Sequence, residues 1–136
     1  MLRSILAVAA GIAIVTVLGM AGMAILLVAS YGIPLGMTPV VPGWPFLAAN
    51  LAATALAGVA GGWVAASVGR RRPLVHAVAV ALALTALMAP SVRPRPREPV
   101  WFAHALLAFA VVGVVAGGAL RGTSAPRRAA TGSRRA

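Results

Sequence analysis

The apolar positions of this 136-residue chain gather in four long runs, which clusters of proline, glycine or arginine separate. The runs cover about residues 4–30, 46–69, 74–92 and 100–120, and none contains a lysine, arginine, aspartate or glutamate. An ionised side chain at the middle of a bilayer costs about 3 kcal/mol or more, so lipid-exposed helices need such runs. Because a backbone in hydrocarbon must satisfy its own hydrogen bonds, the pattern predicts an all-α, integral membrane four-helix bundle.

The third run is the shortest of the four. It has 16 residues between Pro73 and Pro90, which makes about 24 Å of helix, whereas a span needs about 20 residues to cross about 30 Å. This helix is therefore predicted to continue past Pro90, or to lie where flanking arginines reach the membrane surface.

The first run has a second interpretation, which is a cleaved signal peptide. The segment MLR precedes it, and GMAGMA at residues 19–24 contains small residues typical of a cleavage site. The apolar run continues through ILLVAS, which favours an uncleaved anchor. Cleavage would leave three spans.

The composition agrees with a membrane protein. The chain is 61% hydrophobic and 10% charged, with a mean hydropathy of +0.97, and one soluble core of this size cannot bury so much apolar surface. Its basic residues are all arginine, and alanine, glycine, valine and proline are abundant, which indicates a bacterial origin. The chain has no cysteine, which excludes thiolate metal sites and cysteine nucleophiles.

The arginines predict an orientation. Nine of the twelve fall on the side of both termini and of the turn between the second and third runs, whereas Arg93, Arg95 and Arg97 fall opposite, beside Glu98. By the positive-inside rule both termini are predicted to lie in the cytoplasm, with the chain in a bacterial inner membrane.

The predicted membrane domain covers residues 1–120, and residues 121–136 form a basic tail that is predicted to be disordered. With a net charge of +11, the expected partner is the anionic inner leaflet, at about 1 kcal/mol per arginine near the surface. The predicted headgroup contacts are Arg70, Arg71, Arg72, Arg121, Arg127, Arg128, Arg134 and Arg135. No interleaved aromatic pattern suited to reading bases accompanies them, so nucleic acid is not an expected partner.

An internal repeat is one interpretation of the second and fourth runs. A shift of 56 positions lays FLAANLAATALAGVAGG at residues 46–62 on FAHALLAFAVVGVVAGG at residues 102–118. The match suggests two helical hairpins related by an axis along the membrane normal. The first and third runs do not align, and chains rich in alanine and glycine also match by chance.

Small residues recur at helical spacing in the second and fourth runs, where they let backbones approach closely. The predicted helix-packing residues are Ala49, Ala53, Ala57, Gly58, Gly61, Gly62, Ala65, Gly113 and Gly117. They have two interpretations: they close the four-helix bundle, or one ridge faces outward and holds a second copy or a partner membrane protein.

Three polar residues suggest a pocket in the half of the membrane away from the cytoplasm. Asn50 and Thr54 are four apart, hence on one helix face, and His104 is predicted to lie at a similar depth. His76 is predicted to lie at the opposite end from His104, on the order of 15 Å away in height, so the two cannot share an ion. Neither a metal, a cofactor nor a catalytic residue is predicted, because paired carboxylates and nucleophile motifs are absent from the sequence.

The segment AGGWVAASVGRRRPLVHAVAVALAL at residues 60–84 resembles a stretch of small uncharacterised bacterial membrane proteins, in which a glycine-rich helix ends in basic residues before a helix with an early histidine. The resemblance implies four membrane helices and no activity. The first functional hypothesis is a non-enzymatic accessory or scaffold subunit of the inner membrane. The alternative is a small oligomeric transporter, channel or lipid-handling protein that uses the polar pocket.

Overall fold

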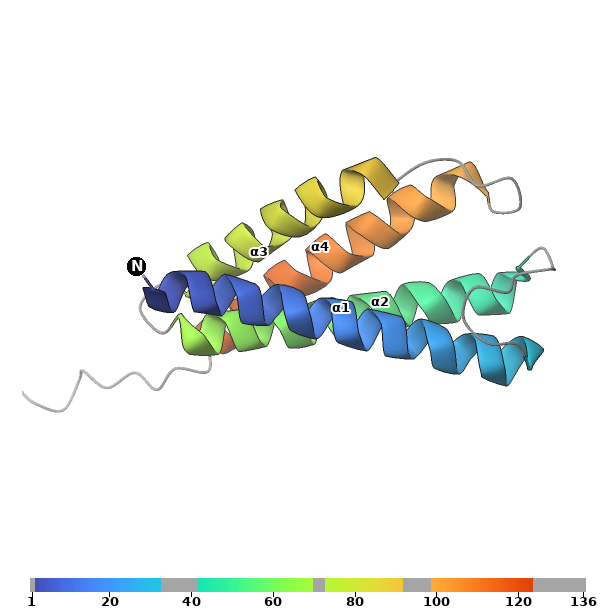
Figure 1. Ribbon diagram of the computed structural model, residues 1–136, viewed down its shortest axis with the longest axis horizontal. Coiled ribbons are helices and arrows are strands. Elements are labelled where there is room, and N and C mark those ends of the chain that lie inside the picture. Colours follow the sequence, from blue (N-terminus) through green and yellow to red (C-terminus); the bar gives the residue numbers. More distant parts are fainter. Residues whose placement is uncertain (1, 33–41, 70–72, 92–98, 124–136) are drawn as a thin grey trace, which may run out of the picture.

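The computed structural model describes residues 2–32, 42–69, 73–91 and 99–123, and it confirms an all-α bundle of four packed helices. The elements are α1 (Leu2–Tyr31), α2 (Trp44–Val68), α3 (Pro73–Met88), a short 3-10 turn η1 (Ala89–Ser91), and α4 (Val100–Thr123). Successive helices run in opposite directions, so α2 and α4 are parallel to each other (Figure 1). We call the end that holds the chain's N-terminus the N-terminal end of the bundle, and the other the opposite end.

Three of the helices, α1, α2 and α4, are long and apolar enough to cross a membrane. Large apolar side chains also point outward along their lengths: Ile25 is 67% exposed, Leu56 70% and Val112 67%. A helix that is apolar on its outer as well as its inner face needs lipid around it. The chain is therefore a multi-pass helical membrane protein in contact with a bilayer.

The α3 helix is shorter than predicted. It ends at Met88, and the chain passes Pro90 in the 3-10 turn rather than in a continued α-helix. Proline has no backbone N–H to give to the preceding turn, and its ring clashes with that turn. With 16 residues, α3 is about 24 Å long at the α-helical rise.

Arg121 belongs to a helix and not to a tail. The fourth helix was predicted to end at about residue 120, but α4 continues to Thr123 and carries Arg121 in its last turn. A cation there lies favourably at the negative end of the helix dipole. The remaining tail, residues 124–136, lies outside the described residues.

Local sequence fixes two of the helix ends. Gly32, directly after α1, has a φ of +65°, a left-handed conformation that glycine adopts without strain, and its N–H donates to Val28 O at 2.9 Å. Pro45 lies in the first turn of α2, where its missing N–H removes no helical hydrogen bond.

The buried side chains form two separate clusters. The cluster toward the N-terminal end contains Val15, Ala65, Ala77, Val80, Ala81, Leu84 and Val114. The cluster at the opposite end contains Leu27, Phe46, Leu47 and Phe102. Beside the second cluster the rings of Trp44 and Trp101 pack with centroids 5.9 Å apart, and amphipathic rings of this kind favour a membrane interface.

Candidate functional site

Glycines bring α2 and α4 into backbone contact. An ideal Cβ at Gly58 would lie only 2.6 Å from the carbonyl oxygen of Ala110, and one at Gly62 would overlap the carbonyl oxygen of Val114. A Cβ at Gly117 would overlap the carbonyl oxygen of Val59 in the same way. Only residues without a side chain fit here, and dispersion contacts between such close backbones hold membrane helices together.

The contact between α2 and α4 is reciprocal. The Cβ positions of Gly58 and Gly113 each approach the other's Cα at 3.2 Å, so the contact relates positions 55 apart, one fewer than the 56 of the sequence alignment. If an axis related the hairpin α1–α2 to the hairpin α3–α4, the contact between α2 and α3 would be repeated as an equal contact between α4 and α1. The structure has the first contact but almost nothing of the second, so the symmetry is confined to the pair α2–α4.

The second small-residue ridge of α2 faces α1. A Cβ at Gly61 would overlap Val15 Cγ2 and lie 2.8 Å from the carbonyl oxygen of Gly11, while a Cβ at Gly22 would lie 3.4 Å from Ala53 Cβ. Ala57 and Ala65 are buried on α2, and Ala49 is half-buried. The ridges of α2 that face α1 and α4 are therefore both in contact with helices of the same chain.

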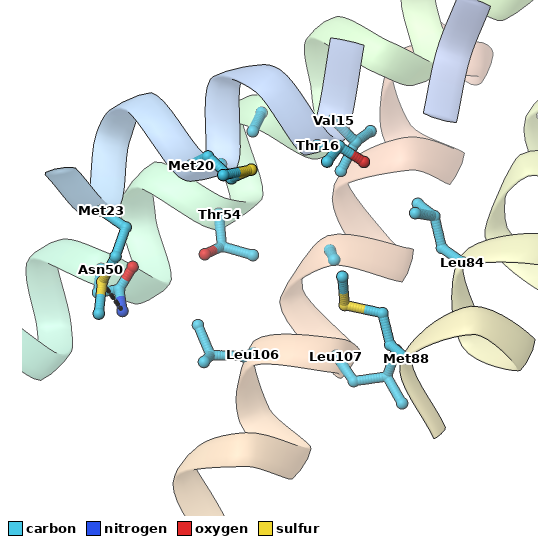
Figure 2. A pocket seen from close by; sticks show the side chains of 13 residues that line it. Val15, Thr16, Met20, Met23, Asn50, Thr54, Leu84, Met88, Leu106 and Leu107 are labelled. Carbon is cyan, nitrogen blue, oxygen red and sulfur yellow. Dashed lines mark hydrogen bonds between the residues drawn. The ribbon is translucent and has the colours of Figure 1, made fainter. Parts of the chain in front are cut away.

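A cavity of about 350 Å³ lies between the two buried clusters, where α1 and α4 diverge (Figure 2). All four helices contribute to it, and most of its wall is apolar. Three methionines line it, Met20 and Met23 from α1 and Met88 from α3. Methionine is flexible and polarisable, which suits it to a wall that adapts to different contents.

Two of the three predicted pocket residues line this cavity. Asn50 and Thr54 are both among its lining residues, one turn apart on α2, together with Thr16 of α1. Asn50 is only 6% exposed, and its Nδ2 donates to Met23 Sδ at 3.4 Å, the dashed line in Figure 2. The structure thus brings the carboxamide and two hydroxyls to one cavity.

His104 lies outside the cavity. It is exposed, and its Nδ1 lies 3.1 Å from the carbonyl oxygen of Val100, one turn earlier in α4. His76 lies at the N-terminal end, where its ring packs on Gly69. In the part of the chain that the structure describes, no group of three metal-ligating side chains gathers.

The contribution of α1 to the cavity was not predicted from the sequence. Thr16, Gly19, Met20 and Met23 all line it, and their spacing of i, i+3, i+4 and i+7 places them on one helix face. That spacing was a readable signal. Because the rest of α1 is equally apolar, it did not stand out from its surroundings.

Arg121 is the predicted headgroup residue that the structure describes. Its Nε donates to Ser67 Oγ at 3.1 Å, and its Cζ lies 5.9 Å from the centroid of the Trp63 ring. These contacts tie the last turn of α4 to the last turns of α2. The other predicted headgroup arginines, at positions 70–72, 127, 128, 134 and 135, lie outside the described residues.

We expect Arg121→Lys to loosen this end of the bundle modestly. Lysine keeps the charge but loses the planar group that stacks on Trp63 and the fixed Nε donor to Ser67. The expected loss in unfolding free energy is about 0.5–1 kcal/mol, measured by denaturant titration in detergent. Arg3→Lys, at an exposed position of α1, is the matched control. An equal effect of both changes would contradict a specific role for Arg121.

Comparisons with protein-family models, with curated proteins and with solved structures give no match. The candidate site is a cavity that opens at the side of the helical bundle, with Asn50 and Thr54 in its wall, and it rests on the geometry of this chain alone.

Proposed function

We propose that this chain is a non-enzymatic protein of a bacterial inner membrane, with both termini cytoplasmic, which binds a hydrophobic molecule drawn from the surrounding bilayer. One observation carries the proposal: the cavity between α1 and α4 lies within the spanning part of the bundle. This is the lipid-handling alternative of the two functional hypotheses.

The depth of the cavity supports a ligand from the membrane. Its lining residues on the three long helices fall within positions 15–23 of α1, 50–57 of α2 and 106–110 of α4, about six residues or more from the ends of those helices. Leu84 and Met88 complete the wall from the last turns of α3. At this depth the bundle is surrounded by acyl chains rather than by water. Since α1 and α4 make almost no contact with each other, the space between them is the natural route for a molecule from the lipid phase.

The size and wall of the cavity also fit a small molecule. Binding sites for small molecules commonly have volumes of about 300–1,000 Å³, with mostly apolar walls and a few placed polar groups. The cavity has about 350 Å³, apolar walls and three neutral polar side chains, Thr16, Asn50 and Thr54. Neutral polar side chains of this kind can orient a small apolar molecule by hydrogen bonds.

The scaffold hypothesis receives less support than the binding of a hydrophobic molecule in the cavity. It drew on small-residue ridges that would face a partner helix. Both ridges of α2 contact α1 or α4 of the same chain, so the feature that motivated an outward docking surface has an internal use.

The test is to fill the cavity from Gly19. A Cβ at Gly19 meets no atom within 4 Å, and Gly19 lines the cavity, so Gly19→Leu adds bulk there without forcing the helices apart. The probe is the hydrophobic photoreagent 3-(trifluoromethyl)-3-(m-iodophenyl)diazirine in phosphatidylcholine vesicles. We expect it to label Met23 and Asn50 in the wild-type chain, and Gly19→Leu to reduce that labelling at least about fivefold, as the loss of a small-molecule site requires.

Ala9→Leu is the matched control, because Ala9 is exposed on the same helix and the added bulk points into lipid. It should leave labelling of Met23 and Asn50 unchanged. Wild-type labelling no greater at these two residues than at the outward-facing Leu56, or equal labelling of wild type and Gly19→Leu, would refute the proposed function.

A further inference from the structure

The carboxamide of Asn50 could form stronger hydrogen bonds than the one that the structure shows. A carboxamide offers two donor hydrogens and an acceptor oxygen, while a thioether sulfur is a weak acceptor. In the structure Nδ2 of Asn50 donates to Met23 Sδ at 3.4 Å. An oxygen acceptor brought into the cavity would form a stronger hydrogen bond than the sulfur does. The side chain is more than nine-tenths buried, with 6% of its surface exposed, so this exchange would occur away from water.

The cavity wall carries no charge that could balance a charged ligand. Its polar side chains are Asn50 and two threonines, and none of the described residues that line it is ionisable. Burying an ion among such groups, at a depth surrounded by hydrocarbon, is strongly unfavourable. An ordinary phospholipid headgroup is thereby excluded from the cavity, although its acyl chain is not.

Thr54 adds a second donor at the same place. It lies one turn after Asn50 on α2, and both residues line the cavity (Figure 2). Two neutral donors on one face of one helix, within a wall whose one other polar side chain is Thr16 of α1, match a single carbonyl oxygen on an apolar molecule. A pure hydrocarbon has no acceptor atom, so neither donor would form a hydrogen bond with it.

We infer that the cavity selects an uncharged, membrane-dissolved molecule that carries a carbonyl oxygen, of the ketone or quinone class, and that Asn50 donates the selecting hydrogen bond. The inference rests on the proposed function and narrows it from any hydrophobic molecule to this chemistry. The Met23 thioether acts as the resting acceptor, and the carbonyl oxygen displaces it from Asn50 Nδ2.

The test compares two competitors that differ only in the carbonyl group, 2-tridecanone and tridecane. Each is titrated against diazirine labelling of the cavity in phosphatidylcholine vesicles, and its concentration is expressed as mole fraction in the bilayer. For the wild-type chain we expect the ketone to compete at an about fivefold lower mole fraction, the gain typical of one additional hydrogen bond. Asn50→Leu, which keeps the volume and removes the donor, should abolish the difference while tridecane still competes.

Met23→Leu keeps the test decisive if Asn50→Leu fails to fold. It removes the resting acceptor of Asn50 without touching the donor, so the ketone no longer has to displace the sulfur and the preference for the ketone should increase. A purely structural role of the pair Asn50 and Met23 predicts no such increase. Equal competition by ketone and hydrocarbon in the wild-type chain overturns the inference and leaves the proposed function standing, whereas failure of the diazirine to label the cavity at all overturns both.

Discussion

Replacing Gly62 with isoleucine is expected to prevent the native packing of α2 on α4. A Cβ at this position would overlap the carbonyl oxygen of Val114 and lie 2.7 Å from its carbonyl carbon and 2.9 Å from its Cα. These are backbone atoms, which cannot rotate aside as a side chain can, so the two helices must move apart. We expect the unfolding free energy to fall by about 3 kcal/mol or more, the upper range for overpacked interfaces.

The measurement is the midpoint of unfolding when sodium dodecyl sulfate is titrated into mild detergent micelles, followed by circular dichroism. Gly19→Ile is the matched control, since the same side chain enters open space there. It should unfold within about 0.5 kcal/mol of the wild type, as changes away from close contacts usually do. If Gly62→Ile unfolded at the wild-type midpoint, the glycine contact would not be what holds α2 against α4.

Replacing Gly61 with isoleucine is expected to detach α1 from a bundle whose other helices stay packed. Gly61 faces α1, where a Cβ would overlap Val15 Cγ2 and lie 2.8 Å from the carbonyl oxygen of Gly11. The neighbouring Gly62 faces α4 instead, so the two adjacent substitutions disrupt different helix pairs. The α1 helix is the most exposed of the three long helices, and its buried residues are only Ala7, Gly11, Val15 and Leu27.

A disulfide can report this detachment cleanly, because the chain has no cysteine of its own. The Cβ of a residue at position 22 would lie 3.4 Å from Ala53 Cβ, close to the separation that disulfides require. The pair Gly22→Cys and Ala53→Cys should therefore oxidise almost completely in the parent chain. Adding Gly61→Ile should slow this oxidation at least about tenfold, as an α1 separated by several ångströms would. Adding Gly19→Ile should not, and equal oxidation in both backgrounds would mean that α1 does not depend on Gly61.

Element positions were predictable from the sequence because lipid imposes a simple rule. Long uncharged runs must be helices, and the four runs became α1 to α4 with ends shifted by a few residues. The shifts have local causes. Pro90 ends α3 at Met88, and α4 takes in Arg121, whose guanidinium finds Ser67 and Trp63.

Helix rotation was harder to predict, and with it the cavity. In a soluble helix the apolar face marks the inside, but here inner and outer faces are equally apolar, as the exposed Ile25 and Leu56 illustrate. Asn50 and Thr54 were found because polar residues stand out in such a helix. His104 was grouped with them on depth alone, and depth carries no information about the direction of a side chain. Thr16 and Met20 were missed because the rest of α1 is as apolar as the helix face on which they lie.

The packing of α2 against α4 also has a consequence for how sequences descended from this one can change. Outward positions such as Leu56 and Val112 need only remain apolar, so mutations among leucine, valine, isoleucine and alanine drift there almost freely. At Gly58, Gly62, Gly113 and Gly117 even one added methyl group meets backbone atoms, so nearly every substitution there is expected to disrupt the packing of α2 on α4. In distantly related sequences that keep this fold, the four spaced glycines would be the recognisable feature, while the apolar residues around them would differ.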